Sequence, residues 1–179
     1  MLGVGSNGRL FEEVRTRRGL SYGAYSSFPS RADEAILAAT AQTQNSTADE
    51  VVQVMLDQFA ALGANPAAED GLEKRRLYLG GTVTRALATS SGFNALAAGL
   101  MLQGIAAREA TVYADRLAAV SPELATEVAR RYVTPERASV IVVGNAAEFL
   151  VDLKAVRPDV TVIPAAELDL SRADLGIGG

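Results

Sequence analysis

Arg15 and Tyr22 are the two residues of this chain whose types and spacing are best suited to chemistry. They lie seven positions apart, with Gly19 between them. A guanidinium and a phenol can both donate hydrogen bonds to a carbonyl oxygen or to a developing oxyanion. Residue types alone also fit ordinary roles, with Arg15 as a surface arginine and Tyr22 as a half-buried strand residue. Strict alternation along a strand predicts that Tyr25 lies on the face opposite Tyr22, where it would serve packing.

A second candidate site is the glycine pattern from Gly3 to Gly8, which formally fits the dinucleotide fingerprint G-x-G-x-x-G. That fingerprint must follow a strand and open a strand-helix-strand crossover. Only Met1 and Leu2 precede it here, and a short charged helix and a hairpin follow. We therefore interpret the glycines as a tight entry loop, and nucleotide binding remains the weaker hypothesis.

The residue types that are missing exclude several kinds of site. The chain contains no cysteine and no histidine. Disulfides, thiolate metal sites and a serine–histidine triad are therefore excluded, and a zinc site would need carboxylates alone. We expect no cofactor and no metal on this chain. The net charge of −4 argues against a general nucleic-acid binder, and no apolar run has the length of a membrane span.

The elements that must position Arg15 and Tyr22 are a helix and a hairpin. The pattern predicts a helix from Arg9 to Arg18, ended by Gly19, because its apolar residues fall on one stripe. Residues 20–28 alternate as a strand, 29–33 are typical of a turn, and 34–43 would be the returning strand.

Five further helices are predicted downstream. Thr47 opens a capping box for a helix ending at Gly63, and Pro66 opens a long helix to about Thr89 that Gly80-Gly81 interrupts. The others span about Phe93–Leu102, Glu109–Ala119, and a helix that Ser121 caps and that stops before Pro135, with an inward face formed by Leu124, Val128 and Tyr132.

The chain is then expected to return to β-structure. The continuous apolar run Ala138–Val143 predicts a buried strand, Gly144–Lys154 a loop and a helix, and Val160–Ile163 a last short strand. A hairpin followed by grouped helices favours an α+β fold over alternating parallel units. We expect an antiparallel or mixed sheet with helices packed on one face, a single domain over residues 1–165 and a polar tail over 166–179.

The stretch Leu10-Phe11-Glu12-Glu13-Val14-Arg15, followed by Arg18-Gly19-Leu20-Ser21-Tyr22, resembles a known signature. It is similar to the non-catalytic C-terminal half of the pitrilysin/insulinase-type zinc metallopeptidases, the superfamily that includes mitochondrial processing peptidase. The glycine-rich entry, the hairpin, the helix after Thr47 and the long helix with Leu79-Gly80-Gly81 follow the same order, so the resemblance covers most of the chain.

The resemblance implies a function that is shared between two halves. Those halves close around an extended peptide, and only one carries the inverted zinc motif His-x-x-Glu-His. The other half contributes an arginine and a tyrosine that lean toward the substrate backbone, and these correspond by spacing to Arg15 and Tyr22. The expected partners are a histidine-bearing domain or subunit, which would hold the zinc, and an extended peptide.

The resemblance also leaves a second function open, a catalytically inactive scaffold or assembly subunit with the same fold. A domain of this family usually opens with further residues before the glycine-rich loop, including a strand. We therefore expect an N-terminally incomplete sheet with an open edge, which favours homo- or hetero-oligomer formation. The sequence leaves the compartment open, and a bacterial periplasm or cytoplasm would both be compatible.

Overall fold

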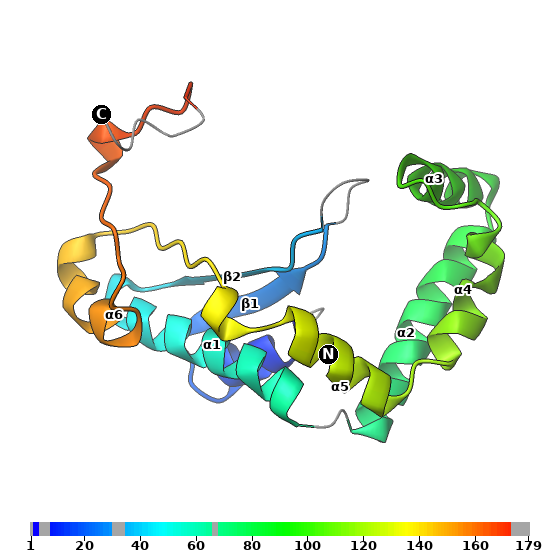
Figure 1. Cartoon of the computed structure of the whole chain (residues 1–179), viewed down its shortest axis with the longest axis horizontal. Helices are drawn as coiled ribbons and strands as arrows, with labels where there is room; N and C mark the ends of the chain where they lie inside the picture. The colour runs from blue at the N-terminus through cyan, green and yellow to red at the C-terminus, as the bar shows by residue number, and fades with distance from the viewer. Residues whose placement is uncertain (1, 4–7, 30–34, 66–67, 173–179) are drawn as a thin grey trace.

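A computed structural model describes residues 2–3, 8–29, 35–65 and 68–172. Figure 1 shows a two-stranded hairpin beside a long helix, with a helical arm that leads away from them. The longer elements, in chain order, are η1 (Phe11–Thr16), β1 (Ser21–Ser27), β2 (Ala38–Thr43), α1 (Ala48–Ala64), α2 (Glu69–Leu87), α3 (Ser90–Leu102), α4 (Glu109–Ala118), α5 (Pro122–Tyr132) and α6 (Leu150–Val156). Single 3-10 turns are η2 (Asn45–Thr47), η3 (Pro135–Arg137), η4 (Ala146–Glu148) and η5 (Ala165–Glu167).

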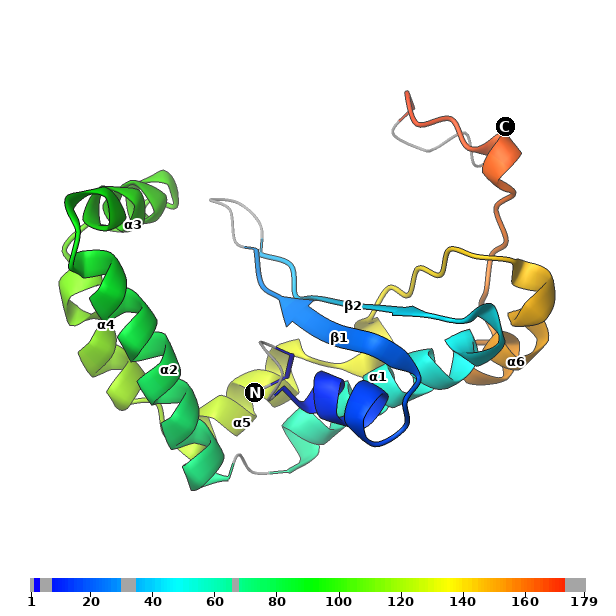
Figure 2. The same cartoon turned by 180° about the vertical axis from the view of Figure 1, so that it is seen from behind.

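The main core lies between the hairpin, η1 and α1. Leu10 and Val14 of the first helical segment have 0% of their surface exposed, and Ala24 of β1 is equally buried. They pack against Val51 and Val54 of α1, which lie three positions apart and so share one helix face. Figure 2 shows η1 and α1 beside the hairpin. This packing fixes the position of η1 against β1.

The hairpin is antiparallel, and its register contains one irregularity. Ser21 pairs with Thr43, whereas Ala24 pairs with Ala41, so three steps along β1 match two steps along β2. One residue is therefore extra in β1, which is a β-bulge at Tyr22-Gly23. A bulge of this kind shifts every later side chain of the strand to the other face.

The arm consists of α2, α3 and α4. In both views α2 and α4 run side by side, and α3 turns across their far end (Figures 1 and 2). Leu72 and Ala110 are buried in this part, and the Arg76 guanidinium donates to the Val120 carbonyl oxygen at the base of the arm. Arg76 thereby joins α2 to the residues that precede α5.

Most predicted helices are confirmed with small shifts of their ends. The Ser121 hydroxyl accepts the backbone N–H of Leu124 at 3.2 Å, which is the predicted N-cap. The α+β class and the antiparallel pairing are confirmed as well. Some predictions lie outside the described residues. They concern the centre of the glycine pattern (4–7), most of the predicted turn and the first residue of the returning strand (30–34), Pro66, and the end of the predicted tail (173–179).

The two predicted C-terminal strands are wrong. No strand is assigned to residues 138–143 or 160–163, and the only backbone hydrogen bond that either run makes with the described residues is the local one from the Ala138 N–H to the Pro135 carbonyl oxygen. Ile141 and Val143 are 86% and 94% exposed, whereas Val142 packs against the second core cluster around Phe149. An apolar run forms a strand only where the backbone of a neighbouring strand supplies partners for its N–H and C=O groups.

Three smaller expectations are also wrong. The Thr47 side chain caps no helix N–H, because its hydroxyl bonds Thr43 Oγ1 and the Gln44 carbonyl oxygen. Gly80-Gly81 does not interrupt α2, which is continuous. The predicted inward stripe of α5 is exposed, although α5 packs against α1; its members are Leu124, Val128 and Tyr132.

Candidate functional site

The site begins with η1, a widened helical turn that places Phe11 and Arg15 on one side of the helix. The backbone N–H of Arg17 donates to the Glu12 carbonyl oxygen at 2.9 Å, an i to i+5 bond that defines a π-helix. Such turns are rare and occur frequently at functional sites. Because Leu10 and Val14 anchor the opposite side in the core, Phe11 and Arg15 are left at the surface of η1.

Gly19 turns the chain from η1 into β1. Its φ of 65° lies in the left-handed region that glycine adopts without steric cost. The N–H of Gly19 donates to the Arg15 carbonyl oxygen, and the N–H of Leu20 donates to that of Val14, each at 2.9 Å. These bonds close the end of the helix and bring Tyr22 back beside Arg15, as the sequence predicted.

Arg15 and Tyr22 are in direct contact. The Arg15 Cζ atom lies 4.4 Å from the centre of the Tyr22 ring and 4.9 Å from that of Phe11. The guanidinium therefore lies over two aromatic rings, each within the distance of a cation–π contact. Tyr22 is 84% exposed, so it is not the half-buried strand residue that the pattern alone suggested.

The neighbouring arginines have different partners. Arg18 Nη1 lies 2.6 Å from Glu13 Oε2, and Arg17 contacts both Glu12 and Glu13. Within the part of the chain that the structure describes, no carboxylate or carbonyl oxygen bonds the Arg15 guanidinium, whose only contacts are aromatic. Its N–H donors remain available to an acceptor from outside the chain.

Tyr25 also belongs to this cluster, which corrects the expectation that it faces away from Tyr22. Its ring centre lies 6.0 Å from that of Phe11, at an interplanar angle of 50°. The bulge at Tyr22-Gly23 brings both tyrosines to the same face of β1. Gly23 is the signal in the sequence that could have revealed this, since a glycine inside a strand pattern is typical of a bulge.

The glycine pattern offers no comparable geometry. The Gly3 carbonyl oxygen accepts the backbone N–H of Ser26 at 2.9 Å, and a Cβ atom at Gly3 would collide with the Ser26 backbone. Glycine is therefore required at position 3 for close packing against β1. This finding favours the entry-loop interpretation over nucleotide binding.

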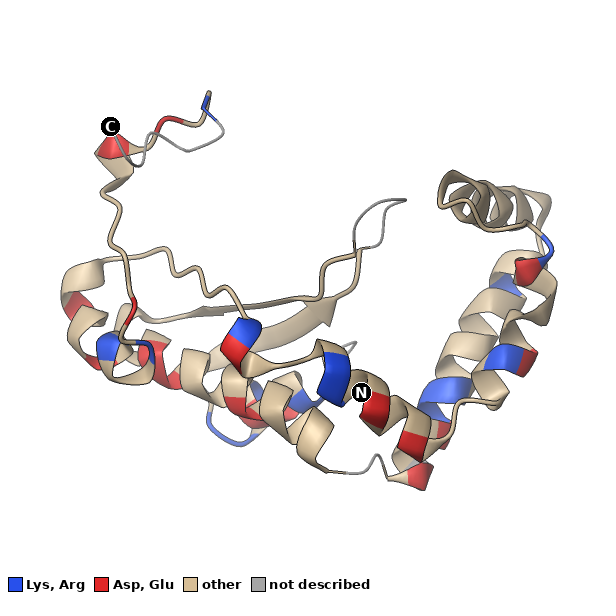
Figure 3. Ribbon diagram, viewed as in Figure 1, with Lys and Arg blue, Asp and Glu red and all other residues tan. Residues whose placement is uncertain are grey.

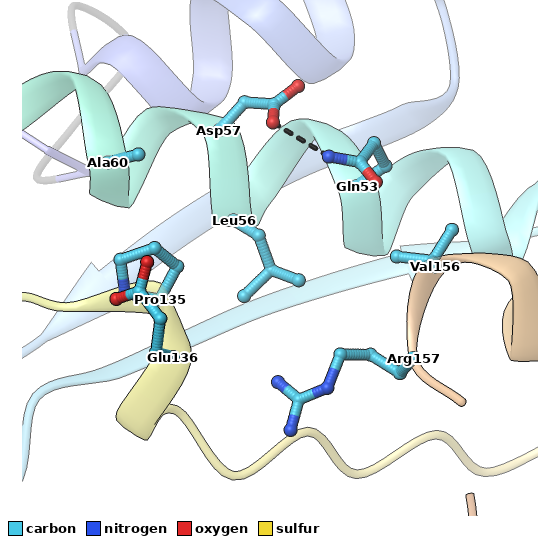
Figure 4. Close-up of a pocket in the computed structure, with 8 residues that line it drawn as sticks. All are labelled: Gln53, Leu56, Asp57, Ala60, Pro135, Glu136, Val156 and Arg157. Carbon is cyan, nitrogen blue, oxygen red and sulfur yellow. Dashed lines mark hydrogen bonds between the residues drawn. The ribbon is translucent and has the colours of Figure 1, made fainter. Parts of the chain in front are cut away.

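A shallow pocket of about 400 Å³ lies elsewhere, on α1 between η3 and α6. Figure 4 shows that its walls carry Gln53 and Asp57, joined by a 2.7 Å hydrogen bond, together with Glu136 and Arg157. Arg157 also bonds Asp159 and the Ala138 carbonyl oxygen, and the hydrogen bond to Asp159 lowers the pKa of that carboxyl below its ordinary value. No residue of the Arg15 cluster lines this pocket.

The described residues contain no group of three acidic side chains close enough to hold a metal ion, and the sequence has no histidine or cysteine. Among the described helices, none combines the length and the apolar character needed to cross a membrane.

Comparison with known proteins gives one family match. Residues 1–77 match the model of the family described as peptidase M16 inactive domain, and this segment contains η1, the hairpin and α1. Arg15 and Tyr22 both lie inside it. A search of curated proteins finds no match.

Several solved structures share the fold, and two of them serve for comparison. One is a peptidase M16 inactive domain from Pseudomonas fluorescens, with a TM-score of 0.67 and 21% identity; the alignment covers 76% of this chain and 32% of that one. The other is a proposed zinc protease from Bordetella pertussis Tohama I, with a TM-score of 0.66 and 17% identity over 74% of this chain and 72% of that one. This chain thus spans about a third of the length of the Pseudomonas structure.

Proposed function

We propose that this chain is the peptide-holding half of a two-part metallopeptidase of the pitrilysin type (M16). The match of residues 1–77 to the inactive-domain family and the fold shared with the two solved structures support this proposal. An extended peptide would lie against β1, with its carbonyl oxygens accepting from Arg15 and Tyr22. Zinc would be supplied by a histidine-bearing domain or chain, and homo- or hetero-oligomer formation stays part of the proposal.

The observation that carries this proposal is the set of contacts made by the Arg15 guanidinium. Its guanidinium is stacked on Tyr22 at 4.4 Å and has no acceptor among the described residues, while Arg17 and Arg18 are paired with glutamates. A guanidinium held by rings keeps its N–H edge for an external oxygen. Hydrogen bonds from a charged donor are stronger than neutral ones, which suits both a carbonyl and an oxyanion.

The surface beside Arg15 suits a peptide backbone. Neither β1 nor β2 contains a charged residue, and Figure 3 shows both strands in the tan that marks uncharged residues. An uncharged sheet neither attracts nor repels particular substrate charges. This fits recognition of the backbone of a peptide more than recognition of its side chains.

Binding of a fluorescein-labelled, acetyl- and amide-capped decapeptide of alternating serine and valine tests the proposal by fluorescence anisotropy. We expect Arg15→Ala to weaken binding about tenfold and Tyr22→Phe to weaken it about two- to tenfold, because each loses a donor to the peptide. Arg17→Ala is the matched control and should bind as the wild type does, since Arg17 is engaged by Glu12 and Glu13. Equal binding by Arg15→Ala and the wild type would contradict the proposal, as would peptidase activity of the isolated chain.

A scaffold function is the second candidate, and one observation favours it. The accessible surface is 11999 Å², whereas a compact monomer of this mass would expose about 8,300 Å². The excess of about 3,700 Å² is of the size that obligate interfaces bury. A scaffold predicts that Arg15→Ala and Tyr22→Phe leave peptide binding and assembly unchanged.

A further inference from the structure

We infer that Phe11 and Tyr25 are positioning residues for Arg15 and that the bulge in β1 builds the support they provide. The inference rests on the proposed peptide-holding function, which concerns Arg15 and Tyr22 alone. It adds a second layer to that site, in which Phe11 supplies another ring against the guanidinium and Tyr25 contacts Phe11.

The first step is the contact between Phe11 and Arg15. The guanidinium carbon lies 4.9 Å from the Phe11 ring centre and 4.4 Å from that of Tyr22, so both rings contact the charged group. A surface arginine normally samples many rotamers, and fixing it before a ligand arrives reduces the entropy lost on binding. Phe11 is suited to this because it contacts the cation without offering an acceptor that would compete with the peptide.

The second step is the support of Phe11 by Tyr25. Their ring centres are 6.0 Å apart in a tilted arrangement, which is a favourable geometry for an aromatic pair. The Tyr25 ring also lies over Gly23, where an added Cβ atom would be 2.5 Å from the phenol oxygen. Glycine at position 23 therefore leaves the space that the ring occupies.

The third step is the bulge. In a regular strand Tyr22 and Tyr25 would point to opposite faces, and only one of them could meet η1. The extra residue between Ser21 and Ala24 puts both on one face. Tyr22 then contacts Arg15, and Tyr25 contacts Phe11, which precedes Arg15 by four positions in η1.

The first experiment needs no ligand and measures the NMR chemical shift of the Arg15 Nε–Hε group. Ring currents of two stacked rings should displace it upfield, and Phe11→Leu or Tyr25→Leu should return at least a third of that displacement. Tyr25→Phe keeps the ring and should change nothing. Arg131, whose Cζ lies 5.2 Å from the Tyr132 ring centre, is the matched control that none of these variants should affect.

The second experiment measures binding of the same capped decapeptide. Loss of one cation–π contact at an exposed site predicts about two- to fivefold weaker binding for Phe11→Leu, with Phe11→Tyr restoring it. If Arg15→Ala weakens binding while Phe11→Leu and Tyr25→Leu do not, the positioning role is refuted and the proposed function stands. If Arg15→Ala has no effect either, the proposed function fails. Should Phe11→Leu not fold, Tyr25→Leu, which leaves Phe11 in place, decides between these outcomes.

Discussion

At the scale of single residues, the arginines of this chain differ in the groups that contact their guanidinium. Arg17 and Arg18 are paired with glutamates on their own helix, and Arg157 is bonded to Asp159. Exposed ion pairs of this kind contribute little to stability. Arg15 differs because aromatic rings hold it and leave its donors available, which is why the proposed function depends on it.

The pair between Arg157 and Asp159 gives a prediction at this scale. Arg157→Gln should raise the pKa of Asp159 toward its ordinary value, because the side-chain hydrogen bond from Arg157 is the largest cause of the lowered pKa. A carboxyl whose pKa is lowered in the folded state stabilises the fold above its unfolded pKa, and this contribution disappears as the pH falls through the folded pKa.

A ¹³C NMR titration of the carboxyl groups measures this effect. Asp169 is the internal control, since its pKa is lowered by a hydrogen bond from Ser171 and should not respond to Arg157→Gln. An unchanged Asp159 pKa in the variant would show that the hydrogen bond at 3.3 Å is not maintained in solution.

At the scale of elements, the turn at Gly19 determines where Tyr22 lies. We expect Gly19→Ala to destabilise the fold by about 1 kcal/mol, because a Cβ atom is strained in the left-handed region. Its φ is 65° and no atom lies within 4 Å of the added Cβ position, so strain is the only cost expected. Urea unfolding measures the difference.

Gly71→Ala is the control for that prediction. Gly71 lies within α2 and its added Cβ would also meet nothing within 4 Å. Replacing a helical glycine by alanine should stabilise by about 0.5–1 kcal/mol. The two substitutions should therefore change the free energy of unfolding in opposite directions. A change in the same direction for both would contradict the role given to Gly19.

Prediction from the sequence succeeded for most helices and failed for the C-terminal strands. The helices at 90–102, 109–118 and 122–132 were predictable because caps, glycines and apolar spacing are local signals. The run 138–143 carries an equally strong local signal but forms no strand, because a strand is completed by a neighbouring backbone and not by its own residues. The apolar stripe of α5 failed for the same reason, since amphipathicity does not say which surface covers it.

At the scale of the whole molecule, the helical arm makes the chain extended. A compact chain of this length would have a radius of gyration of about 16 Å. We expect small-angle X-ray scattering from a dilute solution to give a clearly larger value, because α2, α3 and α4 lead away from the hairpin and the accessible surface is 11999 Å². A value near 16 Å would mean that the arm folds back on the sheet in solution.

The sequence by itself determined the class of fold, the order of the helices, the absence of histidine and cysteine, and the Arg15–Tyr22 pair. These follow from residue types and short spacings. Only the tertiary structure decided that Arg15 lies over two rings, that Tyr25 shares the face of Tyr22, and that 138–143 pairs with no second strand. The physical reason is that a bulge is set by the register of two strands, and a ladder by the presence of a second backbone, and both depend on residues far away along the chain.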